Sequence, residues 1–487
     1  MNFFRRMTQW IQHSDNITSP STSVIVNDKV EQARRAQYAE QYDDALALLI
    51  EAMNLAEEQG NTTIKVDITL SHADILIARE DYEAAKAILN ELRDESELRQ
   101  HRAPLAYALA SLGTIEQKQG HFDAASDLYE ESRRIAELIQ TDGANGRATA
   151  HLADIYLLDG NASYAIYLLR DAIPRLIRSG DKELLGYFQA RLGEALIAIG
   201  QPQEGMAVMQ QGLEAAFVLK HQAQVRDISQ KLGYHALQLA DYDKAIQYLR
   251  DALRLYDKTT HSSDIVVLLC QLSHAFYSMG KSHESLDYAK QANELIDSIT
   301  DTSVIAMAKA ALGLSLSAVG KNDEALAYLQ AAEQAYADLD ADVFYMDVLR
   351  NLALSQYKKG DFDTAIASYE RALEKGSSLP FQVAQVYTDL ATLATGQGDD
   401  KAALDYHRKA IQQYMDSRHH NYVARSYCAL GIIYMQLGDG KMARRAYEEA
   451  LVQLNTMDDV TTRGTVLALV ANAFTEFGDI ESAESFY

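Results

Sequence analysis

Apolar residues recur at helical spacing along most of this chain, and short turn-like breaks separate the runs. Around residues 359–362 the apolar positions on either side of the break are Leu349, Leu352, Ala353 and Tyr357, then Ala365, Tyr369, Ala372 and Leu373. Steps of three and four residues place side chains on one face of an α-helix. The pattern therefore predicts two amphipathic helices joined by a tight turn.

This helix-turn-helix design returns every 40 residues, with one slip of two residues near the end. The turn position is glycine in most repeats and Glu40, Glu80 or Ala240 in the others. The turn positions are Glu40, Glu80, Gly120, Gly160, Gly200, Ala240, Gly280, Gly320, Gly360, Gly398, Gly438 and Gly478. Residues 24–487 therefore contain twelve repeats, the last one incomplete.

Two columns of small residues support this register. Alanine, glycine or serine stands seven residues before every turn position and again five residues after it, as at Gly113 and Ala125 around Gly120. Two helices that cross closely tolerate only small side chains at the crossing point. A single helix pair cannot bury its apolar faces alone, so the repeats are expected to stack as a solenoid.

The residues at fixed places in these repeats resemble the tetratricopeptide repeat family. Repeat eleven reads Tyr427-x2-Leu430-Gly431-x2-Tyr434, followed by Ala443, Tyr447 and Ala450, and repeat three has the same pattern. The family pattern is W-x2-L-G-x2-Y followed by A-x3-F. The resemblance covers about residues 24–487 and implies an all-α fold, a right-handed α-solenoid of about twelve repeats.

The repeat differs from the family standard in length and at its ends. It is 40 rather than 34 residues long, and the closing proline is missing. The longer repeat looks like that of kinesin light chains, of cell-polarity adaptors, and of bacterial regulators that sense peptides or proteins. The pattern does not decide among these three groups.

Composition indicates a cytoplasmic protein that does not bind nucleic acid. The chain has 69 acidic and 45 basic residues and a formal charge of −24, which repels phosphate backbones. Its two cysteines, Cys270 and Cys428, lie about four repeats apart, too far to bridge in a solenoid, so both are expected to be reduced thiols. No run of about 18 apolar residues indicates a membrane span. We expect one elongated body.

Residues 1–23 lie outside the repeats. Phe3, Phe4, Met7, Trp10 and Ile11 share one helical face beside two arginines, which predicts a short amphipathic helix, and a flexible linker follows it. Contact of this helix with a membrane is one interpretation. A cap over the first repeat or a disordered start is favoured over it, because so short an apolar face binds lipid weakly.

No pattern of catalytic, cofactor-binding or metal-binding residues emerges. The spacings of zinc sites, phosphate loops and nucleophile elbows are absent from the sequence, and Lys281 after Gly280 is a turn of the repeat. His419 and His420 form an adjacent pair near Asp416, but we expect them to be solvated loop residues rather than metal ligands. The paired acids Asp399-Asp400 and Asp458-Asp459 are expected to cap helices. The sequence predicts a protein that is not an enzyme, without cofactor or metal.

The resemblance implies that the first helix of each repeat lines a concave wall. In the middle repeats the corresponding positions are apolar and aromatic, with charges of both signs at the rim, which suits a bound peptide or helix. The candidate partner-binding residues are Tyr187, Tyr234, Val267, His274, Tyr277, Met307, Leu314, Arg350, Leu354 and Lys358. For each of them, packing between adjacent first helices is an equally supported role.

The walls of the outer repeats carry more charge. Arg34, Asp67, Asp74, Arg147 and Asp154 occupy these positions near the start of the chain. The lysine and asparagine triplet with which some relatives clamp a chaperone's C-terminal carboxylate is missing, so that function is disfavoured.

The last repeat leaves apolar residues without a capping helix. They are Leu467, Val470, Phe474, Phe477 and Phe486. Solenoids need polar caps for solubility. We therefore expect a second copy of the chain, forming a homodimer, a partner protein or further sequence to cover this edge.

Two functions of different class follow. The leading hypothesis is a non-enzymatic adaptor or scaffold that binds a protein or peptide on the concave wall. The alternative is a regulator in which a peptide ligand changes the shape of the array and so controls a partner.

Overall fold

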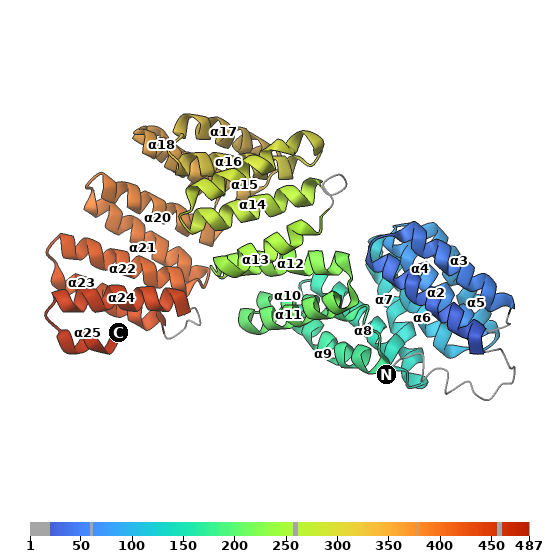
Figure 1. The fold of residues 1–487 in the computed structure, drawn as a ribbon. Coiled ribbons are helices and arrows are strands. Elements are labelled where there is room, and N and C mark those ends of the chain that lie inside the picture. Colours follow the sequence, from blue (N-terminus) through green and yellow to red (C-terminus); the bar gives the residue numbers. More distant parts are fainter. Residues whose placement is uncertain (1–19, 59–61, 257–261, 377, 455–459, 487) are drawn as a thin grey trace. The chain divides into compact units, whose positions relative to one another are not determined.

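The computed structural model describes residues 20–58, 62–256, 262–376, 378–454 and 460–486. Within these ranges every regular element is a helix, and the helices form twelve consecutive pairs. They group into two compact units, with the boundary near residue 237 and again within α13 (Tyr242–Arg254). In each unit the helices stack as successive layers (Figure 1). The predicted all-α solenoid of about twelve helix pairs is confirmed.

Unit 1 contains repeats one to five and most of repeat six. Its helices are α2 (Pro20–Tyr38), α3 (Tyr42–Glu58), α4 (Thr62–Ala78), α5 (Tyr82–Leu98), α6 (Arg102–Lys118), α7 (Phe122–Leu138), α8 (Asp142–Leu158), α9 (Ala162–Ser179), α10 (Leu185–Ala198), α11 (Pro202–Leu219), α12 (Gln222–Gln238) and the end of α13.

Unit 2 contains the start of α13 and repeats seven to twelve. Its further helices are α14 (Ser262–Ser278), α15 (Ser282–Glu294), the 3-10 turn η1 (Ile296–Ser298), α16 (Thr302–Ala318), α17 (Asn322–Asp338), α18 (Asp342–Lys359), α19 (Phe362–Lys375), α20 (Pro380–Gly396), α21 (Asp400–Asp416), α22 (His420–Gln436), α23 (Gly440–Leu454), α24 (Val460–Glu476) and α25 (Ile480–Phe486).

Several turns between repeats have the same geometry as the turns within repeats. Gly120 has a φ of 82°, and the amide of His121 donates to the carbonyl of Glu116 at 2.9 Å. One half-repeat later Gln140 has a φ of 55°, and the amide of Thr141 donates to Ala136 at 3.0 Å. Both are left-handed helix terminations. In these parts of the chain the backbone repeats every 20 residues, a period that is hard to recognise in the sequence because most turns between repeats lack glycine. Ile299 and Gly376 instead end their helices with negative φ.

The small-residue columns are explained by contacts within each helix pair. A Cβ added to Gly113 would lie 2.7 Å from the ring of Tyr129, and one added to Gly431 would lie 2.6 Å from Tyr447. Where serine occupies the columns its hydroxyl is satisfied, because Ser273, Ser285 and Ser315 bond to one another at 2.8 to 3.1 Å. Substitution at these columns is therefore expected to separate the paired helices.

First helices lie on the inside of each stack. Consecutive first helices such as α4 and α6, or α14 and α16, contact each other directly. Second helices of consecutive repeats make no comparable contact in the described part of the chain. A stack whose first helices touch and whose second helices spread apart curves with the first helices inward, so we call their shared face the inner wall.

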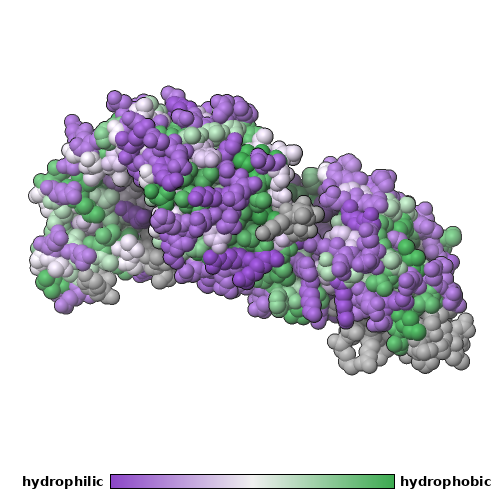
Figure 2. Space-filling model, turned by 45° about the horizontal axis from the view of Figure 1, so that its top comes forward, coloured by the Kyte–Doolittle hydropathy of each residue, from purple (hydrophilic) through white to green (hydrophobic). Residues whose placement is uncertain are grey.

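The ends of the array differ in part from the expectations. We predicted an amphipathic helix and a flexible linker in residues 1–23, but helix α2 begins at Pro20, within the predicted linker; residues 1–19, which include the predicted amphipathic helix, lie outside the described residues. In the last repeat Val470 and Phe474 are buried in a core with α22 and α23. Hydrophilic residues cover much of the face shown in Figure 2, with hydrophobic residues in separate patches.

Candidate partner-binding surface

The ten candidate residues do not all lie in one unit. Tyr187 and Tyr234 belong to unit 1, on α10 and α12. The other eight belong to unit 2 and lie on three consecutive first helices, α14, α16 and α18. The surface to consider as one site is therefore the inner wall of unit 2.

The apolar part of this wall consists of half-buried side chains between fully buried neighbours. Val267, Met307, Leu314 and Leu354 are each partly accessible. The residues that flank them along the helices, among them Val266, Ala306, Ala308 and Ala353, are 0% exposed and belong to the core. We call these four partly accessible side chains, on α14, α16 and α18, the apolar strip.

Arg350 is the polar centre of the wall. Its Nε donates to Asp389 Oδ2 at 2.7 Å and its Nη1 donates to Gln385 Oε1 at 2.8 Å, both on α20. Asp347 Oδ1 lies 3.5 Å from Nη1 on the third side. Two carboxylates balance the guanidinium and hold it in one position. Arg350 therefore presents a fixed donor rather than a mobile one.

The side chain of Tyr277 shows that α14 faces this polar centre. Burial raises the pKa of Tyr277, the Asp389 carboxylate raises it further, and the Arg350 guanidinium lowers it. These charges lie two and three repeats further along the chain than Tyr277. Charged groups of repeats nine and ten therefore act electrostatically on Tyr277 of repeat seven.

Two basic residues complete the wall. Lys358 Nζ donates to the backbone oxygen of Ser317 at 3.4 Å and has no carboxylate partner in the described residues. Burial lowers its pKa and also that of His274, whose ring is accessible from the inner side. A neutral imidazole, a tyrosine hydroxyl and one ammonium group thus border the apolar strip and can bond to backbone or acidic groups of a ligand.

The inner wall of unit 1 has a different character, because a chain of ion pairs runs along it. Asp154, which is 2% exposed, accepts from the Tyr187 hydroxyl at 2.8 Å and from Arg191 Nε at 2.7 Å. Arg191 also donates to Glu194 at 2.6 Å, and Lys231 lies 3.2 Å from Glu194. Tyr187 is therefore engaged by its own chain.

The second unit 1 candidate, Tyr234, is 46% exposed and contacts the ring of His235 edge-on. No described hydrogen bond holds its hydroxyl. It stays a candidate contact residue on unit 1.

The sequence reading missed the α20 contribution to the site. Gln385 stands thirteen residues before Gly398, so the same inner column extended by one repeat identifies it. Asp389 stands nine residues before Gly398, a column also occupied by Arg191 and Lys231, and all three take part in ion pairs. Charge in that column is the signal that could have found Asp389.

The other singled-out residues have structural contacts. The His419 ring lies 4.1 Å from that of Phe381, and His420 bonds to Gln453 at 3.0 Å. Asp399 caps α21, accepting from the Ala402 amide at 3.0 Å, as predicted, while Asp458 and Asp459 lie outside the described residues.

The remaining features are the two cysteines, possible metal sites and possible membrane spans. Cys270 and Cys428 are free, buried thiols, and burial raises the pKa of each to about 12. Among the described residues no group of three potential ligands gathers to hold a metal ion. None of the described helices is both long and apolar enough to cross a membrane.

Comparisons with known proteins add the following. Models described as tetratricopeptide repeat match residues 105–139, 227–259, 304–378 and 382–455. No curated protein matches the chain.

Among solved structures, BtubC (BKLC) from P. vanneervenii is 19% identical over 45% of this chain and 91% of its own, with a TM-score of 0.36. A Rap protein complexed with competence and sporulation factor is 15% identical over 70% and 95%, with a TM-score of 0.48. The apo quorum sensor NprR from B. thuringiensis is 14% identical over 70% and 97%, with a TM-score of 0.47.

Proposed function

Because the chain is a tetratricopeptide repeat protein, we propose that it is a non-enzymatic adaptor that binds a peptide or helix of a partner protein on the inner wall of unit 2. The observation that carries the proposal is the partly accessible apolar strip of Val267, Met307, Leu314 and Leu354, bordered by the fixed donor Arg350. Apolar anchors with a few placed polar groups are typical of peptide recognition.

The polar groups suggest how a ligand is oriented. Lys358 lies at the carboxyl end of α18 and bonds only to a backbone oxygen, so its ammonium can pair with an acidic side chain or terminus of the ligand. Arg350 cannot change partners without leaving Asp389 unpaired. We therefore propose that the apolar strip supplies most of the affinity for the ligand and that Lys358 fixes the position of the ligand along the wall. Because the chain has a formal charge of −24, we propose that its partner is a protein and not a nucleic acid.

The test is capture of partners from a lysate of the source cells by the full chain and by a Met307→Glu, Leu314→Glu variant. The two carboxylates introduced into the partly buried strip are expected to lower retention of a specific partner at least tenfold. The matched control is Val452→Glu, since Val452 is 57% exposed on the second helix α23. Circular dichroism checks that all three proteins fold. Equal capture by the strip variant and the intact chain would exclude this wall as the binding site.

A ligand-responsive regulator is the second candidate, and the contacts between repeats favour it. Arg350 joins α18 to α20 and Lys358 joins α18 to α16, so these polar contacts link consecutive repeats along the wall. A ligand that competes for them changes the curvature of the stack. Small-angle scattering of the chain with and without the captured partner segment separates the two: a changed radius of gyration supports the regulator, and an unchanged one supports a static adaptor.

A further inference from the structure

The turn residue of the first repeat makes a contact that no nearest-neighbour solenoid requires. Glu40 accepts two bonds from Arg226, at 2.7 Å from Nη1 to Oε2 and at 2.9 Å from Nη2 to Oε1. The guanidinium in turn lies over the ring of Tyr256, 4.7 Å from its centroid. Residues 40 and 226 belong to repeats one and six, whereas in a solenoid each repeat ordinarily contacts only its neighbours.

The neighbours of Glu40 make parallel contacts. The ring of Tyr38 stacks on that of His221 with centroids 4.8 Å apart, and the Nε2 of Gln37 donates to Glu183 Oε1 at 3.2 Å. Gln37 and Tyr38 are each only 8% exposed, although both lie at the end of the first helix. Three residues at the end of the first helix and the turn of repeat one thus dock on the start of repeat six and on the loop between repeats four and five.

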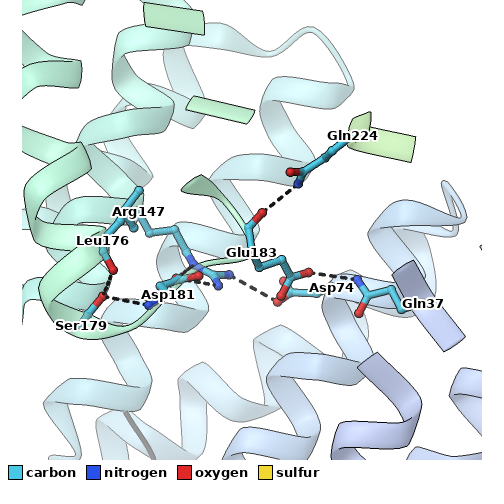
Figure 3. A network of polar contacts seen from close by, with 8 residues as sticks. All are labelled: Gln37, Asp74, Arg147, Leu176, Ser179, Asp181, Glu183 and Gln224. Atoms are coloured by element: carbon cyan, nitrogen blue, oxygen red, sulfur yellow. Dashed lines mark hydrogen bonds and ion pairs between the residues drawn. The ribbon is translucent and has the colours of Figure 1, made fainter. Parts of the chain in front are cut away.

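A second set of contacts involves the loop that carries Glu183, the partner of Gln37 (Figure 3). Arg147 of α8 donates to Asp74 of α4 at 3.3 Å and to Asp181 at 3.1 Å. The loop that carries Asp181 and Glu183 is held from the other side, because Gln224 Nε2 donates to the Glu183 backbone oxygen at 2.8 Å. The loop therefore bonds to residues from repeats one, four and six, and Arg147 links it to repeat two.

Side chains rather than helix packing make this closure. Helix α2 packs on α3 and to a smaller extent on α4, and α10 is not among its main packing partners in the described residues. The described core cluster that includes Ile228 and Leu232 of α12 contains no residue of α2. The apolar core of repeat one likewise consists of residues from α2, α3 and α4. Separating repeat one from repeats five and six would therefore break polar contacts and one ring stack without opening a core.

The identity of residue 40 supports a specific role. Glu40 has a φ of 60°, in the left-handed region that glycine adopts most easily, and most other repeats have glycine there. Glycine would relieve that strain but has no side chain to reach Arg226. Glu80 stands at the same turn of the next repeat with a φ of 65° and makes no ion pair in the described residues. The two positions are matched in backbone and differ in the contact.

We propose that unit 1 is closed on itself by a latch, formed by Gln37, Tyr38 and Glu40 on one side and Glu183, His221 and Arg226 on the other, and that opening this latch exposes the inner wall of unit 1. In the closed form repeat one contacts residues just before α10 and at the start of α12, the two helices that carry Tyr187 and Tyr234. The latch is separate from the strip on unit 2, and neither depends on the other.

Amide hydrogen exchange on the full chain tests the latch with two variants, Glu40→Gly and Glu80→Gly. Both remove a glutamate from a left-handed turn, so both are expected to fold, and only Glu40→Gly breaks the contact with Arg226. The readout is residues 181–184 and 221–226, which are far from either substitution in sequence. Glu40→Gly is expected to raise exchange there roughly tenfold, the effect of losing a charged, bidentate pair.

Glu80→Gly is the control and is expected to leave exchange in residues 181–184 and 221–226 at the level of the unaltered chain. If Glu40→Gly also leaves those residues unchanged, the contacts do not hold repeat one in place and the latch is wrong. If both variants raise exchange equally, the effect comes from the turn backbone, which likewise overturns it.

Discussion

The inner walls of the two units are built on the same helix pairs but carry opposite chemistry. In unit 1 Asp154 accepts from Tyr187 and Arg191, and Arg191 also donates to Glu194, so the charges of this part of the wall are paired within the chain. In unit 2 the corresponding helices expose an apolar strip beside Lys358, whose ammonium has only a backbone partner. The repeat pattern fixes where a wall lies, and residues outside that pattern decide whether it is open to a ligand.

The largest expected difference concerns the two arginines at the centres of the walls. Arg191→Ala would leave Asp154, whose side chain is 3% exposed, as a buried unpaired charge, so we expect a loss of about 3 kcal/mol in the unfolding free energy of unit 1. Arg350→Ala would leave Asp389, whose side chain is 30% exposed, and water can replace the lost donor, so we expect about 1 kcal/mol in unit 2. Urea unfolding followed by hydrogen exchange in each unit measures both.

Replacing Asp154 and Arg191 together shows whether the stability is lost through an unpaired buried charge or through lost packing. Asp154→Asn together with Arg191→Met removes the two charges at similar volume and is expected to recover most of the stability that Arg191→Ala loses. Equal losses for Arg191→Ala and Arg350→Ala would mean that the two walls do not differ in access to water.

A smaller effect is expected to be shared by the units, because it concerns the scaffold and not the walls. A Cβ at Gly113 meets the Tyr129 ring at 2.7 Å, and a Cβ at Gly313 meets Leu329 Cγ at 2.6 Å. Gly113→Ala and Gly313→Ala are each expected to lower stability by about 1 to 3 kcal/mol through overpacking. Thermal unfolding of the two variants checks this, with Gly464→Ala as the control, since a Cβ there meets no atom within 4 Å.

The smallest effect depends on pH and belongs to unit 1. Burial and the carboxylates of Asp74 and Asp181 raise the pKa of Glu183 to about 7, while Arg147 and Arg34 lower it. A carboxyl whose pKa is raised on folding binds more protons in the folded state, so stability falls as pH rises from about 4.5 through 7.

Glu183→Gln removes the contribution of Glu183 to the pH dependence of stability and leaves the contribution of the histidines in place. At pH 8 the variant is expected to be more stable than the unaltered chain by on the order of 1 kcal/mol, and at pH 5 the difference should nearly vanish, because Glu183 is then protonated. Thermal midpoints at the two pH values measure it. A difference of the same size at both values would show that ionisation of Glu183 plays no part.

The sequence predicted the helix pairs and their register because backbone sterics set both. Only small residues fit where Gly113 faces Tyr129, and a left-handed turn favours glycine at Gly120. These positions can therefore be recognised in the sequence. The sequence could not predict that Glu40 reaches Arg226 or that Arg350 binds Asp389, since side-chain pairing depends on how far the stack curves. It assigned Tyr187 and Met307 to one inner wall, and the two residues belong to separate units.

The contacts between repeat one and repeat six also limit the order in which unit 1 can fold during synthesis. A nearest-neighbour array can fold repeat by repeat as it leaves the ribosome, since each helix pair needs only the one before it. In this chain Gln37 and Tyr38 cannot reach their partners until Glu183 and His221 have emerged, and Glu40 must wait for Arg226. For that interval the end of the first helix exposes a tyrosine ring and an amide that the complete unit buries.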